Sequence, residues 1–181
     1  MSPMKKRNAK PTSLYLLTVS GSPDPRSQSS RLLNSFRFLS TVKVIPSVDI
    51  ATLPLYQPAK DRAPWPTPIL TWRKQWADAV AVVISTPAYL DNLPGPLKNA
   101  LDWLATSGEA GGKSVLPITF PPSLPRGKHV MQSLLWSLQA LGARVPASLP
   151  LAQPDLNFTD NGDIVAGENR DFLVAALELL C

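Results

Sequence analysis

The chain has 181 residues, of which 44% are apolar, and it contains one cysteine and one histidine. This length and apolar fraction suffice for one buried core, so we expect a single domain. A lone cysteine excludes an internal disulfide, and with a lone histidine it leaves too few ligands for a zinc or copper site. No apolar run approaches the ~18 residues of a membrane span. We therefore expect a cytoplasmic protein with no membrane partner and no metal, whose chemistry is supplied mostly by a cofactor.

The net charge of +5 is concentrated at the N-terminus. Residues 1–10 hold four basic side chains and no acidic one, which leaves the rest of the chain near neutral. A basic arm can bind nucleic acid or anionic lipid. However, no aromatic residue interrupts this one, so we predict a disordered, solvated tail over 1–12, a single domain over 13–181 and no nucleic-acid partner.

The first third of the chain is predicted to contain two strands and one helix. The apolar run 14–19 is typical of a buried parallel strand. A serine-rich loop leads into a predicted helix over 30–40, and a second strand is predicted over 42–45. The proline-punctuated connection 46–68 shows no clear element, and connections of this length often carry function or form interfaces.

The alternation of helices and strands continues to the end of the chain. Helices are predicted over 69–78, 97–106, 129–141 and 169–180, and strands over 79–84, 115–119 and, most weakly, 145–151. Pro117 lies inside a predicted central strand, where its missing N–H predicts a bulge or an early end to pairing.

Strands that alternate with helices form a parallel sheet covered on both faces. Five strands in fewer than 190 residues favour a flavodoxin-like three-layer α/β fold with the strand order 2-1-3-4-5. In this fold a ligand binds at the carboxyl ends of the strands. We therefore expect the site in the loops 20–30, 85–95 and 119–127, which follow the first, third and fourth strands.

The first of these loops is rich in hydroxyl side chains and precedes a helix. Such a loop presents N–H groups and the positive end of the helix dipole to an anion, typically a phosphate. It matches neither the P-loop nor the G-x-G-x-x-G pattern, which disfavours an ATP P-loop and a Rossmann NAD site. Alternatively, Ser29 or Ser30 only caps the helix. The loop alone leaves both interpretations open.

The second loop carries the most specific motif of the sequence. It reads Thr86-Pro87-Ala88-Tyr89, followed by Pro94-Gly95-Pro96-Leu97-Lys98-Asn99-Ala100-Leu101-Asp102-Trp103. This stretch resembles the central signature of the NAD(P)H-dependent FMN reductase family. Gly21-Ser22, the segment Asp49 to Tyr56 and the turn 158–164 look like other segments of the family, so the resemblance spans about residues 14–180.

The resemblance implies a noncovalently bound FMN. Its phosphate would be held in the first loop by Ser22, Arg26, Ser27, Gln28, Ser29 and Ser30. Its ring would lie along Pro87, Ala88, Tyr89, Leu90, Asp91 and Asn92. The loop after the fourth strand would close the other side through Thr119, Phe120 and Pro121.

The resemblance also implies the reaction and the partners. NADPH or NADH would pass a hydride to flavin N5, and the electrons would go on to a flavin or a quinone-like acceptor. No catalytic side chain is implied, because the cofactor supplies the reactivity. Relatives are dimers or tetramers, so a homo-oligomer is expected. Trp103 is then expected either at a subunit interface or packed under a neighbouring loop, and His129 in solvent.

Two departures from the family pattern leave alternatives open. Ala88-Tyr89-Leu90 replaces the frequent Glu-Tyr-Asn, and a proline-containing loop after Phe120 replaces a glycine-rich one. Prolines remove N–H donors from that loop. The protein can therefore also be a non-enzymatic FMN-binding electron carrier or a degenerate member that binds flavin weakly. The basic composition counts against the carrier, since flavodoxin-type carriers are generally acidic.

Overall fold

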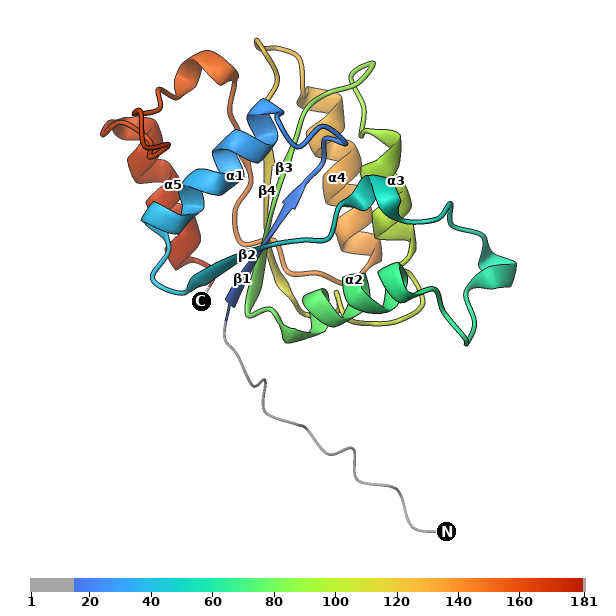
Figure 1. Ribbon diagram of the computed structural model, residues 1–181. Coiled ribbons are helices and arrows are strands. Elements are labelled where there is room, and N and C mark those ends of the chain that lie inside the picture. Colours follow the sequence, from blue (N-terminus) through green and yellow to red (C-terminus); the bar gives the residue numbers. More distant parts are fainter. Residues whose placement is uncertain (1–14, 181) are drawn as a thin grey trace.

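Five parallel strands form one sheet in the order β2-β1-β3-β4-β5 in the computed structural model, which describes residues 15–180 (Figure 1). The order and the parallel pairing confirm the predicted flavodoxin-like fold. The basic tail predicted over 1–12 lies outside the described residues. The strands are β1 (Tyr15–Ser20), β2 (Lys43–Pro46), β3 (Ala81–Thr86), β4 (Ser114–Thr119) and β5 (Leu149–Pro150).

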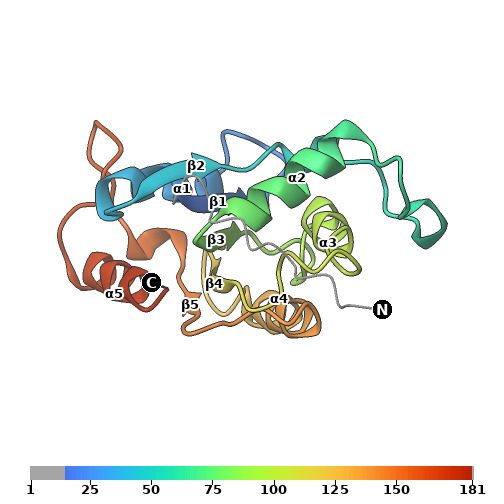
Figure 2. The ribbon, with the colours of Figure 1, turned by 90° about the horizontal axis from the view of Figure 1, so that it is seen from below.

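Helices cover both faces of the sheet, because the central strands β3 and β4 are apolar and buried on both sides. Figure 2 shows α1 and α5 on one face and α2, α3 and α4 on the other. No helix within residues 15–180 is long and apolar enough to cross a membrane. The helices are α1 (Gln28–Leu39), α2 (Thr67–Asp78), α3 (Gly95–Asp102), α4 (Lys128–Ala140) and α5 (Glu168–Glu178). Short 3-10 turns occupy Ile50–Thr52, Pro58–Lys60 and Gln153–Asp155.

Helix α3 ends one turn earlier than the apolar pattern predicts. The carbonyl oxygen of Trp103 accepts hydrogen bonds from Arg73 of α2, at 3.0 Å from Nε and 2.8 Å from Nη2. That oxygen is thus bonded to α2 instead of to an N–H farther along its own helix. The chain turns after Asp102, and the prediction of a helix to residue 106 was wrong for this reason. Strand β5 is likewise shorter than predicted and pairs with β4 only at Ile118 and Thr119.

Pro117 causes neither a bulge nor an early end of β4. The N–H of Val115 donates to Arg144, and the carbonyl of Thr119 accepts from Leu151. The backbone N–H and C=O groups of the odd-numbered residues of β4 therefore point toward β5. The backbone nitrogen of Pro117, which carries no hydrogen, points toward β5 as well. Because β5 pairs with β4 only from Ile118 onward, Pro117 has no strand partner to which an N–H would donate, and pairing with β3 continues without a break.

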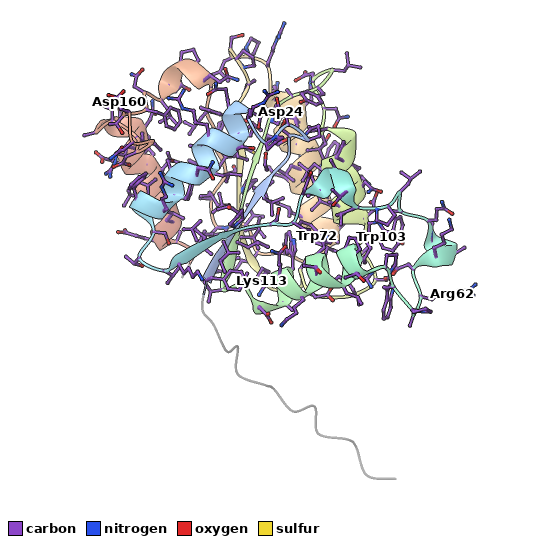
Figure 3. All side chains as sticks on the ribbon, in the orientation of Figure 1. Asp24, Arg62, Trp72, Trp103, Lys113 and Asp160 are labelled. Atoms are coloured by element: carbon purple, nitrogen blue, oxygen red, sulfur yellow. The ribbon has the colours of Figure 1, made fainter. Side chains whose placement is uncertain are left out.

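The long connection between β2 and α2 is fastened to the family-like motif on α3. The side chain of Asn99 accepts from the N–H of Tyr56 at 2.7 Å and donates to the carbonyl of Pro54 at 3.1 Å. The indole of Trp103 donates to the same carbonyl at 2.7 Å. Trp103 therefore packs under this connection, one of the two predicted places, and Figure 3 shows it between α3 and the protruding segment.

Candidate functional site

Three loops meet at the carboxyl ends of β1, β3 and β4, as the topology predicts. They lie at the upper edge of the sheet in Figure 1. The N–H of Gly21 donates to Ser85 at 2.7 Å, and the N–H of Phe120 donates to Thr86 at 2.9 Å. The first and third loops therefore begin hydrogen-bonded to β3, and the second loop continues from β3 itself, which fixes the three starting points relative to one another.

The first loop approaches β3 too closely for any residue but glycine. A Cβ atom placed on Gly21 would lie 2.5 Å from Oγ1 and 2.6 Å from Cβ of Thr86, and 2.9 Å from a methyl group of Leu97. All three distances are shorter than real side chains allow. The glycine at this position is thus required by close packing of the loop against β3.

The beginning of α1 offers unpaired donors to an anion. Ser27 is the N-cap residue, and its hydroxyl accepts from the N–H of Ser30 at 3.2 Å. The alternative in which Ser29 or Ser30 is the cap is therefore wrong. The N–H groups of Gln28 and Ser29 have no partner among the described residues. With the helix dipole behind them, these two groups are suited to bind a phosphate.

The first loop also carries an exposed cation, the guanidinium of Arg26. The carboxylate of Asp24 accepts from the backbone N–H of Arg26 at 2.9 Å and lies 3.6 Å from Nε of the same residue. The Arg26 side chain is 91% exposed, so this ion pair is weak. A phosphate at the start of α1 can therefore draw the guanidinium toward itself.

A cavity of about 310 Å³ adjoins this loop. The serine residues Ser20, Ser22 and Ser30 line one side of it, and the segment from Pro46 to Ile50, which follows β2, lines the other. Arg26 and Ser27 instead line a neighbouring groove together with Arg31 and Arg37. Of the fifteen residues predicted to bind the cofactor, only Ser22 and Ser30 therefore line the cavity.

The second loop forms a tight two-residue turn. Tyr89 and Asn92 exchange two backbone hydrogen bonds of 3.0 Å each, and Leu90 and Asp91 between them have φ angles of 49° and 56°. Both angles are left-handed, as in a type I′ turn, which favours asparagine and glycine over leucine. The Tyr89 hydroxyl lies 3.5 Å from the Ser22 hydroxyl, so the first and second loops touch.

The third loop is bonded to the second through one carboxylate. Asp91 Oδ1 accepts from the N–H of Gly127 at 3.1 Å, and Oδ2 lies 2.5 Å from Nδ1 of His129. The Gly127 N–H, and then His129, lower the pKa of Asp91. His129 is 72% exposed, so the prediction that it lies in solvent is right for its ring, but the ring also has a charged partner.

Residues 14–153 match the family model described as NADPH-dependent FMN reductase, which is more than half of the chain. The protein belongs to this family. It is 38% identical to a quinone reductase of Escherichia coli strain K12 over 107 residues, 58% of this chain and 56% of that protein. It is 46% identical over 56 residues to a 2-hydroxy-1,4-benzoquinone reductase of a Burkholderia species, 31% of this chain and 30% of that protein. The chain thus spans about half or less of these relatives.

Solved structures support the same fold at low sequence identity. FerB, described as a flavoenzyme NAD(P)H:(acceptor) oxidoreductase of Paracoccus denitrificans, superposes with a TM-score of 0.79 at 21% identity. The match covers 92% of this chain and 94% of FerB. An archaeal flavodoxin superposes with a TM-score of 0.56 at 10% identity, covering 92% of this chain and 96% of its own. These likenesses establish the fold alone.

The site of this FMN reductase family member fits a flavin mononucleotide. The free N–H groups of Gln28 and Ser29 suit its phosphate. The hydroxyl of Thr119 is buried at the end of β4 without a hydrogen-bond partner among the described residues. A buried donor of this kind is costly unless a partner arrives, and a polar edge of a flavin ring can be that partner. Phe120, by contrast, is buried in the core and its N–H is bonded to Thr86, so it shapes the start of the third loop without offering a free donor.

One wall of the cavity is formed by residues that were not predicted to bind the cofactor. Asp49, whose carboxylate accepts from the N–H of Ala51, lies in the segment after β2 that lines it. The available signal was topological, because the carboxyl end of β2 lies at the same edge as those of β1, β3 and β4.

Proposed function

We propose that this protein is an NAD(P)H-dependent flavin reductase or quinone-type oxidoreductase that binds FMN. The observation that carries the proposal is the beginning of α1, where two free N–H groups lie in a serine-rich loop that also carries the exposed Arg26 and that touches the turn at Tyr89 through Ser22. Membership in the FMN reductase family supports it. The quinone reductases that match part of the chain support a quinone-like acceptor.

The phosphate and the ring have separate places in this proposal. The loop before α1 binds the phosphate through Ser22, Arg26, Ser27, Gln28, Ser29 and Ser30. The other two loops orient the ring through Pro87, Ala88, Tyr89, Leu90, Asp91, Asn92, Thr119, Phe120 and Pro121. Bound there, FMN would supply the redox chemistry, a hydride transfer from NAD(P)H to N5 and delivery of two electrons to a flavin or a quinone-like acceptor.

The side chains of the site would hold and orient the flavin ring, and none of them is needed to carry the hydride. Buried Thr119 and the backbone of 87–92 would offer hydrogen bonds that hold the ring in one orientation. Reduction of a quinone consumes one hydride and one proton, and no buried acid is needed for the proton if the quinone is bound within reach of solvent.

The visible spectrum and nucleotide oxidation test this function. The protein as purified should show the absorption of oxidised flavin, and protein supplied with FMN should oxidise NADPH or NADH when a flavin or quinone acceptor is present. Comparing both nucleotides decides the preference between them. No oxidation of either nucleotide with any acceptor would overturn the proposal.

Two alternatives give different results in the same experiments. A non-enzymatic FMN carrier would retain flavin tightly and turn over slowly. A degenerate family member, motivated by the leucine in the left-handed turn and by Pro121 and Pro122, would give a flat fluorescence titration with FMN.

We also infer that the protein acts in the cytoplasm as a homodimer or homotetramer. Several large apolar side chains are exposed, among them Trp136 on α4, Leu70 on α2 and Phe172 on α5. They lie on helices of both faces (Figure 2), so each is a candidate contact residue by itself, and the expectation of an oligomer comes from the family resemblance. Light scattering coupled to size-exclusion chromatography should give at least twice the chain mass, and a monomer at all concentrations would contradict this inference.

Reversing the charge of Arg26 should weaken FMN binding but not riboflavin binding. In R26E the new carboxylate repels the phosphate, which riboflavin lacks, and we expect the dissociation constant of FMN to rise about tenfold, or ~1.4 kcal/mol. Fluorescence titration measures both ligands. The matched control is R62E, which makes the same charge change on the protruding connection, far from Asp24 and the first loop in Figure 3. Equal losses for FMN and riboflavin would place the phosphate elsewhere.

A further inference from the structure

The carboxylate of Asp91 joins the two loops that enclose the proposed ring site. One of its oxygens accepts from the backbone N–H of Gly127, at the N-cap of α4, and the other contacts the ring of His129 in the first turn of that helix. These are the hydrogen bonds that tie the tip of the 87–94 loop to the 120–128 loop. We call this contact the Asp91 clasp.

The turn that carries Asp91 is held in an unfavourable conformation. Leu90 and Asp91 are consecutive residues with left-handed φ angles, a region that residues with a Cβ rarely occupy. Leu90 is 103% exposed, so packing of its side chain does not compensate. The hydrogen bonds between Tyr89 and Asn92 and those of the Asp91 carboxylate are what stabilise it. The turn thus directs the carboxylate away from its own loop and onto the next.

We propose that Asp91 is a positioning residue that fixes the distance between the 87–94 and 120–128 loops, and thereby the width of the slot for the flavin ring; this inference rests on the proposed function. The family resemblance implies only that Asp91 lies along the ring. The contacts show that its two oxygens are occupied by the neighbouring loop, so that its effect on the ligand is exerted through Gly127 and His129.

The clasp determines which ring nitrogen of neutral His129 carries the proton. A carboxylate only accepts, so Nδ1 of His129 must donate to it. In D91N the amide oxygen can still accept from Gly127, but the amide nitrogen takes the place of Oδ2 and donates. Nδ1 must then accept, and the proton moves to Nε2. The substitution therefore keeps the clasp and reverses the tautomer.

Two measurements on FMN-free protein test the clasp itself. His129 is the only histidine of the chain, so its ring nitrogen signals need no assignment by mutation. At pH 8 the nitrogen spectrum should show a protonated Nδ1 in the unmodified protein and a protonated Nε2 in D91N. In D91A we expect amide exchange across 120–128 to accelerate about tenfold, whereas D91N should stay within about twofold of the unmodified protein.

FMN titration then tests whether the clasp positions the ligand. D91A should raise the dissociation constant of FMN about fivefold, and D91N should change it less than about twofold. The control is D78A, which removes a carboxylate from the exposed Lys74–Asp78 pair on α2 and should change neither measurement. Unchanged exchange in D91A, or an unchanged tautomer in D91N, would overturn the clasp.

The outcomes separate this inference from the proposed function. If the unmodified protein binds no FMN, the proposed function fails, while the nitrogen spectra and amide exchange still decide whether the clasp exists. If D91A accelerates exchange but leaves FMN affinity unchanged, the clasp holds the loops without positioning the ligand, and our inference is overturned although the function stands.

Discussion

Replacing Gly21 with alanine should abolish FMN binding and lower the free energy of unfolding by about 3 kcal/mol. The added methyl group would meet the Cβ and Oγ1 atoms of Thr86 and a methyl group of Leu97, all at less than 3.0 Å. Thr86 lies in central strand β3, fully buried, so its Cβ cannot move without displacing the strand. The loop must therefore shift, and with it the first turn of α1.

Urea denaturation and FMN titration measure the two consequences of G21A. The control is Gly95→Ala, because nothing lies within 4 Å of a Cβ at Gly95, the first residue of α3. Alanine favours the helix there, so we expect unchanged or slightly raised stability. If the G21A protein were as stable as the G95A protein, the close packing of Gly21 against Thr86 would be contradicted.

Removing the carboxylate of Asp61 should cost about 3 kcal/mol of stability. Its side chain is 3% exposed, and it accepts from Arg73 at 2.7 Å, from the indole of Trp65 at 3.0 Å and from the hydroxyl of Thr106. In D61A the buried guanidinium of Arg73 loses its counter-charge and keeps the Trp103 carbonyl as its hydrogen-bond acceptor, beside the rings of Trp65 and Trp103. Breaking a buried ion pair from one side is costly because the remaining charge stays desolvated.

The same residue makes stability depend on pH in a definite direction. Burial raises the pKa of Asp61, but hydrogen bonds from Thr106, Arg73 and Trp65 outweigh it and hold the pKa below the ordinary 3.8. A carboxyl with a lowered pKa in the folded state stabilises the protein above its unfolded pKa. That contribution should disappear as the pH falls below 3.8 and through the folded value.

Denaturation of D61A and D61N between pH 7 and pH 3 checks both statements. At pH 7 D61A should be less stable than the unmodified protein. Between pH 7 and pH 3 both D61A and D61N should lose less stability than the unmodified protein does. The exposed pair of Lys74 and Asp78 supplies the control, because D78N should cost less than about 0.5 kcal/mol. An acid profile of D61N identical to that of the unmodified protein would contradict the role of Asp61.

Local sequence patterns predicted the elements well and their ends less well. The apolar runs of β3 and β4 and the stripe of α3 are local signals, and each appears where the pattern places it. The end of α3 is not a local matter, because it depends on Arg73, thirty residues earlier in the chain. Likewise, β5 has only two residues, because it pairs with β4 only at Ile118 and Thr119.

The candidate site was predicted as three loops and not as a set of contacts. The strand order alone brings Ser22, Tyr89 and Thr119 to one edge of the sheet, and the sequence was sufficient for that. The link from Asp91 to His129 crosses 38 positions and requires the left-handed turn at Leu90, which no periodicity indicates. The segment after β2 carries no comparable ligand-binding pattern, so its place as a cavity wall follows only from the three-dimensional position of the end of β2.

The anchoring of the long connection has a consequence for protein engineering. Asn99 holds backbone groups of Pro54 and Tyr56, and Trp103 bonds the carbonyl of Pro54 while its ring packs edge-on against that of Tyr56. The exposed side chains of the connection beyond Tyr56 can therefore be exchanged for those of another sequence while these contacts with α3 remain. A designer who wishes to graft a new recognition loop onto this scaffold has a natural insertion point between two fastened ends, at Asn99 on one side and at Arg73 on the other.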